Sequence, residues 1–244
     1  MLKIENLVVW IWEKDILKWV NLEFELWKNY CLLWKNGSGK STLSSFLMWN
    51  PQYISKQWNI LIDWKNLLEM SIEDRSKSWL FLSFQNVPEI SWIKLWEYLR
   101  VIYNISLKNF NTNQLDISPF IFKRHVKKYL EELSIPETFL DRDLNVGFSG
   151  WEKRKIEILQ MKLIWPKYII LDEIDSWLDL DAFRAVAEML KNLSNENNTL
   201  IIITHYFKIL EYIDVDKVYV MKDWKVERSG WLEMINEIME KGFE

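Results

Sequence analysis

The chain has 244 residues, a formal net charge of −4 and a hydrophobic fraction of 49%. This length allows one large domain, or a core with a subdomain, around a sizeable buried core. The slightly acidic balance argues against a duplex-binding surface built on positive charge, so we expect no nucleic-acid partner. No apolar run reaches the roughly 18 to 20 residues of a membrane span, so no direct membrane span is expected.

The N-terminus and the cysteine count indicate a compartment. Residues 1–5 lack the charged start and apolar middle of a signal peptide, so we expect a cytoplasmic protein. Cys31 is the single cysteine, which rules out an internal disulfide. One Cys and two His also cannot supply the four ligands that an iron–sulfur cluster usually takes.

Hydrophobic periodicity divides the chain into three parts. The first is rich in strands, expected at residues 2–9, 16–26, 29–33 and 80–84 and as a pair around Trp64, with a helix at 40–48. Helical periodicity dominates from 88 to about 144, in residues 93–105 and 120–133. Helices (152–164, 181–193, 206–213) then alternate with strands (168–171, 200–204, 217–221). Such alternation predicts a parallel sheet with helices on its faces.

A phosphate-binding loop follows the third expected strand. The segment matches the pattern G-x-x-x-x-G-K-[ST] at every fixed position except the first, where Trp stands in place of Gly. The loop comprises Trp34, Lys35, Asn36, Gly37, Ser38, Gly39, Lys40, Ser41 and Thr42. In such a loop the backbone N–H groups surround phosphates, and we expect Lys40 to reach the β- and γ-phosphates. Ser41 is expected to help hold Mg²⁺. The loop therefore predicts nucleotide binding.

Two carboxylates end the apolar strand at residues 168–171. An Asp at this position, Asp172, can hold the Mg²⁺ system, and the adjacent Glu173 can polarise an attacking water. The alternative is an acidic strand end that faces solvent. Ligands of open α/β sheets gather at the carboxyl ends of strands, which favours the functional interpretation.

Tryptophan occupies positions that suit glycine. The chain has 16 Trp and only 6 Gly. Asp63-Trp64 and Asp223-Trp224 stand between strand-like runs, where Asp-Gly is a strong hairpin signal, and Trp49 and Trp165 shortly precede prolines at expected helix ends. We therefore hypothesise that most Trp positions are encoded by UGA codons that the native host reads as Gly. The candidates are Trp19, Trp27, Trp34, Trp49, Trp58, Trp64, Trp79, Trp92, Trp151, Trp165, Trp177, Trp224 and Trp231. A Trp-rich core is the alternative, and strain or crowding is expected at residues 34, 151 and 177.

The segment Gly147-Phe148-Ser149-Gly150-Trp151-Glu152 resembles the Leu-Ser-Gly-Gly-Gln signature of ATP-binding-cassette (ABC) ATPases. Gln85, the segment 176–179 and His205 fall in the order of that family's Q-loop, D-loop and switch histidine. The resemblance implies an α/β ABC-ATPase fold. Its P-loop RecA-like core and N-terminal antiparallel β subdomain would comprise residues 1–86 and 152–244. A helical subdomain over 87–151 would carry the signature.

The resemblance also assigns roles. ATP and Mg²⁺ are the implied cofactors, with Ser41, Gln85 and Asp172 at the metal and Glu173, His205 and Gln85 as catalytic residues. ABC ATPases act as head-to-tail dimers, so Ser149, Gly150 and Trp151 of one subunit would approach the γ-phosphate on the other. Asp179 would couple the two sites. The phosphate loop, residues 34–42, would bind the nucleotide.

Segments around 145–153, 171–179 and 204–213 further resemble the SufC family, the ATPase subunits of the Suf iron–sulfur cluster assembly system. This implies SufB- and SufD-like scaffold partners, and weak ATP hydrolysis without them, because Lys153 would hold Glu173 in a resting state. Two alternatives stay open: the nucleotide-binding subunit of an ABC transporter, and a pseudo-ATPase if Trp34, Trp151 and Trp177 are genuine.

Overall fold

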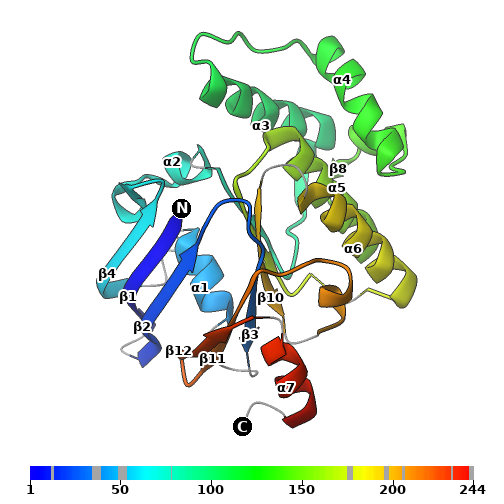
Figure 1. The fold of residues 1–244 in the computed structure, drawn as a ribbon. Coiled ribbons are helices and arrows are strands. Elements are labelled where there is room, and N and C mark those ends of the chain that lie inside the picture. The colour runs from blue at the N-terminus through cyan, green and yellow to red at the C-terminus, as the bar shows by residue number, and fades with distance from the viewer. Residues whose placement is uncertain are drawn as a thin grey trace. The chain divides into compact units, whose positions relative to one another are not determined.

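The computed structural model describes most of the chain as two compact units (Figure 1). The described residues are 1–11, 14–34, 40–48, 54–77, 79–174, 178–194, 198–204, 207–231 and 233–241. The first unit comprises Met1–Phe84, Lys167–Asp175 and Ser194–Glu244, and the second comprises Gln85–Pro166 and Ser176–Leu193.

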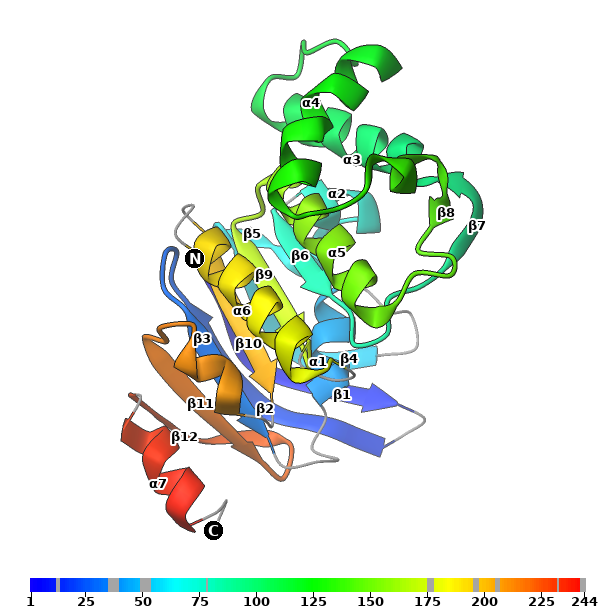
Figure 2. The same ribbon diagram turned by 90° about the vertical axis from the view of Figure 1, so that its right-hand side faces the viewer.

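The first unit contains two sheets. An antiparallel sheet has the order β2-β1-β4-β5, formed by β1 (Leu2–Ile11), β2 (Lys14–Phe24), β4 (Ile54–Ile62) and β5 (Lys65–Asn66). The other sheet has the order β12-β11-β3-β10-β9-β6 (Figure 2). Its strands are β3 (Tyr30–Trp34), β6 (Leu80–Ser83), β9 (Tyr168–Asp172), β10 (Thr199–Thr204), β11 (Lys217–Lys222) and β12 (Lys225–Gly230). Neighbouring strands from β6 to β11 pair in parallel, as the alternation of elements predicts, and β12 is antiparallel.

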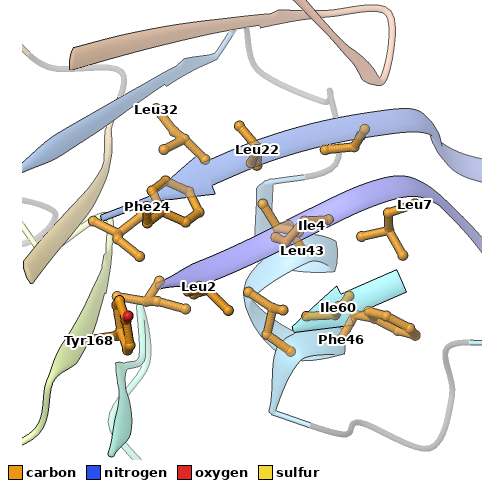
Figure 3. Packing of buried hydrophobic residues seen from close by; sticks show 14 of the residues in the cluster. Leu2, Ile4, Leu7, Leu22, Phe24, Leu32, Leu43, Phe46, Ile60 and Tyr168 are labelled. Carbon is orange, nitrogen blue, oxygen red and sulfur yellow. The ribbon is translucent and has the colours of Figure 1, made fainter. Parts of the chain in front are cut away.

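The core of this unit lies where the antiparallel sheet, helix α1 (Lys40–Leu47) and the parallel sheet meet. Figure 3 shows Leu2 and Ile4 of β1 beside Leu43 of α1, with Phe46 and Ile60 nearby. Alternate residues of the parallel strands, such as Tyr168 and Ile170, join the same cluster. The intervening residues of these strands are buried too, as expected of a parallel sheet covered on both faces.

Short helices complete the first unit. They are η1 (Leu67–Glu69), α2 (Ile72–Lys77), η3 (Phe207–Glu211) and α7 (Glu233–Lys241). The helix expected over residues 206–213 was wrong in type and length, because the segment forms only the short 3₁₀ helix η3, and Tyr206 lies outside the described residues. The strand expected to reach residue 26 ends at Phe24.

The second unit is mainly helical. It contains β7 (Ile90–Lys94), α3 (Leu95–Phe110), α4 (Pro119–Glu132), η2 (Glu137–Asp141), β8 (Asp143–Leu144), α5 (Gly150–Ile164) and most of α6 (Leu180–Ser194). Helices α5 and α6 group with the expected helical insertion of 87–151 and not with the expected core of 152–244. For α5 the reason is its packing against α3 and α4.

Seven tryptophans adopt the left-handed backbone conformation. Among the described residues other than Gly, thirteen have positive φ, and seven of these are Trp. They are Trp19 (52°), Trp27 (65°), Trp64 (69°), Trp79 (68°), Trp92 (74°), Trp165 (46°) and Trp224 (67°). The sequence predicts glycine at turns and helix ends. At many of these positions the backbone conformation also favours glycine.

Candidate nucleotide-binding site

The candidate site lies at the carboxyl edge of the parallel sheet. Register places Leu33 of β3 opposite Thr204 of β10, and Asp172 of β9 opposite Ile203. The ends of these three strands therefore meet at one edge, where open α/β sheets bind ligands. The sequence places the phosphate loop after one of these strands and the two carboxylates at the end of another, and a shared site for them stays a prediction.

The phosphate loop is described only at its two ends. Trp34 is the last residue of β3, and Lys40, Ser41 and Thr42 form the first turn of α1. Lys35, Asn36, Gly37, Ser38 and Gly39 lie outside the described residues. A helix that starts at Lys40 directs its backbone N–H groups toward the strand ends, which is the arrangement that binds phosphate.

Asp172 is tied to the helix that follows the loop. Its carboxylate accepts a hydrogen bond of 2.7 Å from the hydroxyl of Ser44 in α1. Asp172 is 5% exposed and Ser44 is 1% exposed, so the bond is buried and holds the carboxylate in one orientation.

The donors at this edge suit magnesium. Mg²⁺ prefers oxygen ligands from one or two carboxylates and hydroxyls, completed by water and by phosphate oxygens of the nucleotide. Asp172 and Ser41 are donors of this kind. Among the described residues, no group of three or more His, Cys, Asp or Glu could hold a metal ion.

Glu173 occupies a strained backbone position. Its φ is +49°, and its N–H donates to the carbonyl of Ile203 in the neighbouring strand at 2.9 Å. A non-glycine residue held at positive φ costs free energy and is typical of functional sites. The side chain is 9% exposed, so the carboxylate next to Asp172 is largely shielded from water.

The remaining family residues are described in part. His205 lies outside the described residues. Gln85 begins the second unit, and its carbonyl accepts a hydrogen bond of 3.2 Å from the guanidinium of Arg154. Asp179 caps α6, with its carboxylate accepting from the N–H of Ala182 at 2.8 Å. The proposed roles of Gln85 and Asp179 at the nucleotide therefore stay predictions.

The signature segment starts helix α5 with a capping box. The hydroxyl of Ser149 accepts from the N–H of Glu152 at 3.3 Å, and the Glu152 carboxylate accepts from the N–H of Ser149 at 2.7 Å. Gly150 and Trp151 form the first turn. The backbone strain expected at Trp151 is absent, because the residue is helical and its φ is not positive. Its ring lies 4.7 Å from the ammonium of Lys155, measured to the ring centroid. Trp177, where strain or crowding is also expected, lies outside the described residues.

The sequence missed a set of contacts between the signature region and the segment after Gln85. Lys153 pairs with Glu89 at 2.6 Å, and the amide of Asn145 donates to the carbonyl of Pro88 at 2.9 Å. Arg154 adds its bond to Gln85. These partners are separated by 57 to 69 residues, and no short-range pattern predicts such pairs.

Comparison with known proteins agrees with this geometry. A family model described as ABC transporter matches residues 17–176. A probable ATP-dependent transporter, ycf16, of Cyanophora paradoxa is 40% identical, over 100% of this chain and 93% of the relative. The iron–sulfur cluster assembly protein SufC of Plasmodium falciparum is 36% identical over 95% of this chain and 66% of the relative. The solved dimeric structure of MJ0796, a bacterial ABC transporter cassette, matches with a TM-score of 0.77 at 20% identity, covering 95% of this chain and 99% of that one.

The chain therefore belongs to the ABC transporter family. It is an ATP-binding subunit with the ABC-ATPase fold that the signature resemblance predicted. Within the described part of the chain, no helix is long and apolar enough to cross a membrane.

Proposed function

We propose that the chain hydrolyses ATP with Mg²⁺ and uses the energy to drive a conformational change in a SufB/SufD-like scaffold for iron–sulfur cluster assembly in the cytoplasm. The observation that carries the ATPase proposal is the meeting of three strand ends at Asp172 and Glu173. There a buried carboxylate is fixed by Ser44 of the helix that starts at the phosphate loop.

Each residue at this edge has a proposed role. Lys40 and the backbone of residues 34–42 bind the phosphates, while Ser41, Asp172 and Gln85 hold Mg²⁺. When bound by these residues, Mg²⁺ would supply positive charge to the phosphate oxygens. Glu173 orients or deprotonates the attacking water, and His205 contacts the γ-phosphate. The shielding of Glu173 from solvent strengthens its interaction with the reacting groups.

The second half of the site comes from another copy of the chain. We propose that Ser149, Gly150 and Trp151 approach the γ-phosphate bound by the partner copy, with the N-terminus of α5 behind them. Asp179 couples the two sites across the interface. The dimeric structure of a bacterial ABC transporter cassette with the same fold supports this arrangement.

Cluster assembly is preferred over transport because of the motif segments that resemble SufC and the similarity to a relative of that name over 95% of this chain. The second candidate, a transporter subunit, is supported by relatives named as probable ATP-dependent transporters. Both functions use the same nucleotide site, so the site itself does not separate them.

Two partner experiments distinguish these functions. The purified chain is mixed either with a SufB/SufD-like scaffold or with the transmembrane subunit of an ABC transporter, and complex formation and ATP turnover are measured. Cluster assembly predicts a stable complex and faster turnover with the scaffold alone. Stimulation by the transmembrane subunit alone would instead support transport. Lys40→Ala should abolish turnover with either partner, because the phosphates lose their main cation.

We further propose that turnover is slow in the isolated chain. In the resting state Lys153 would hold Glu173 away from the water, and a partner would release it. Lys153 and Glu173 belong to different compact units.

A further inference from the structure

Five of the seven tryptophans at positive φ occupy three kinds of structural position that ordinarily take glycine. Two are hairpin turns: Asp63 and Trp64 have φ of 47° and 69°, and Asp223 and Trp224 have φ of 49° and 67°. Positive φ at both central residues defines the type I′ turn, for which Asp-Gly is a preferred pair. In both hairpins Trp stands at the glycine position.

A third position ends a helix. Trp165 follows α5 with φ 46° and ψ 59°, and its N–H donates to the carbonyl of Met161 at 3.0 Å. This is the left-handed C-terminal cap that glycine usually provides, and Pro166 follows it as expected.

A third kind of position is a bulge within a strand. Leu7 pairs with Val20 and Val9 pairs with Leu17, so Lys18 and Trp19 of β2 oppose the single residue Val8. A residue at positive φ in such a bulge is ordinarily glycine. The pairing of β7 with β8 is also irregular between Ile90 and Lys94, where Trp92 has a φ of 74°.

Burial does not explain these tryptophans. The residues Trp19, Trp27, Trp64 and Trp92 are 60%, 71%, 78% and 93% exposed, so their rings add little to a core. Tryptophan at such a φ is strained because its Cβ meets the backbone. At these four positions the exposed ring gains little from burial to offset the strain. Trp165 differs, because its ring packs against Tyr103 and Phe110.

We infer that these seven positions are glycine positions, and that the native gene encodes them with UGA, read as glycine by its host. UGA differs by one base from the Trp codon UGG and by one from the Gly codon GGA. The amino-acid composition shows only that Trp is abundant and Gly scarce, whereas the backbone conformation identifies seven particular positions. Trp151 and Trp231 have no positive φ, so conformation gives no support for glycine there. The inference does not depend on the proposed function.

Thermal unfolding of single variants tests the conformational claim. Trp64→Gly and Trp92→Gly each relieve strain and lose an exposed ring, so each should raise the Tm by about 2–4 °C. Trp231→Gly is the matched control: its side chain is 72% exposed but its φ is not positive, so no rise is expected. Trp96→Gly, within α3, should lower the Tm because glycine weakens a helix.

A fall in Tm for both Trp64→Gly and Trp92→Gly would overturn the conformational claim. The coding claim is tested by the nucleotide sequence together with the intact mass of the protein from its native host. UGA codons and a mass lowered by the Trp-to-Gly difference at each one are expected. UGG codons at the seven positions, or a mass that retains the indole rings, would overturn it.

Discussion

Lys153 of α5 pairs with Glu89, with 2.6 Å between Nζ and Oε1. The hydrogen bond from Lys153 lowers the pKa of the Glu89 carboxyl. Together with the bonds from Asn145 to Pro88 and from Arg154 to Gln85, this contact ties the segment after Gln85 to the start of the signature helix. Both belong to the second unit. A displacement of Gln85 on nucleotide binding would therefore be transmitted through these contacts to the signature segment, residues 147–152.

Removing the charge of Lys153 tests the proposed resting state. Lys153→Met should raise the basal ATPase rate of the isolated chain about two- to fivefold, because Glu173 would no longer be held. Glu89→Gln is the matched control: it weakens the observed ion pair but keeps the Lys153 charge, and it should not raise the rate. An unchanged rate in Lys153→Met would disprove the resting-state proposal.

Loss of the cap of α5 should affect stability and turnover together. Ser149→Ala removes the acceptor for the Glu152 N–H and should lower the free energy of unfolding by about 1 kcal/mol. Because Ser149 is also proposed to approach the γ-phosphate, turnover should fall as well.

Ser118→Ala is the matched control for that experiment. Ser118 caps α4 of the same unit through the N–H of Ile121 at 3.3 Å, and no nucleotide role is proposed for it. Urea unfolding should show a similar loss of stability in both variants, with turnover reduced only in Ser149→Ala. Equal turnover losses would mean that Ser149 acts only as a helix cap.

Ser44 should influence the metal through Asp172. Ser44→Ala removes the donor that fixes the Asp172 carboxylate, so the Mg²⁺ concentration for half-maximal turnover should rise about 10-fold or more. Ser45→Ala, one position further along α1, is the control and should leave the Mg²⁺ dependence unchanged. A Mg²⁺ titration of turnover that is identical in Ser44→Ala and the unaltered chain would argue against this support of the metal site.

His125 should make the chain less stable in mild acid. Burial, followed by the charge of Lys128, lowers the pKa of His125 below 6.5, and the ring stacks on Tyr103 at 4.9 Å. Its Nε2 has no hydrogen-bond partner among the described residues, which favours the neutral ring.

The sign follows from proton uptake. The unfolded chain binds the proton more tightly, so this contribution to stability is complete above pH 6.5 and is lost as pH falls through the lowered pKa. His125→Phe should therefore flatten the fall in unfolding free energy between about pH 7.5 and 5.5, measured by urea unfolding. Parallel pH profiles for the two proteins would contradict this.

The sequence predicted the parallel sheet well, since its strands are apolar runs such as Tyr168–Leu171, buried on both faces. Because parallel strands end at one edge, it also indicated that β3 and β9, which precede the phosphate loop and the two carboxylates, end on the same side of the sheet. Strand β7, whose residues are all exposed, was missed because it has no apolar alternation. The Lys153–Glu89 pair was missed because charge alone does not select a partner 64 residues away.

Residue 34 is Trp where the phosphate-loop pattern has its first glycine. Comparison of the unaltered chain with Trp34→Gly therefore belongs in every ATP-binding experiment. Tighter ATP binding by Trp34→Gly is expected, because a small residue lets the backbone approach the phosphates. Equal affinities would show that the loop tolerates the indole.

The most direct measurement of the proposed mechanism is the molar mass of Glu173→Gln by light scattering, with and without ATP and Mg²⁺, in the unaltered and the Trp34→Gly background. The Glu173→Gln variant should bind ATP without hydrolysing it, so its molar mass should double when ATP and Mg²⁺ are added. Adding Lys40→Ala should abolish this doubling. A monomeric mass at saturating ATP in both backgrounds would contradict an ATP-driven head-to-tail dimer.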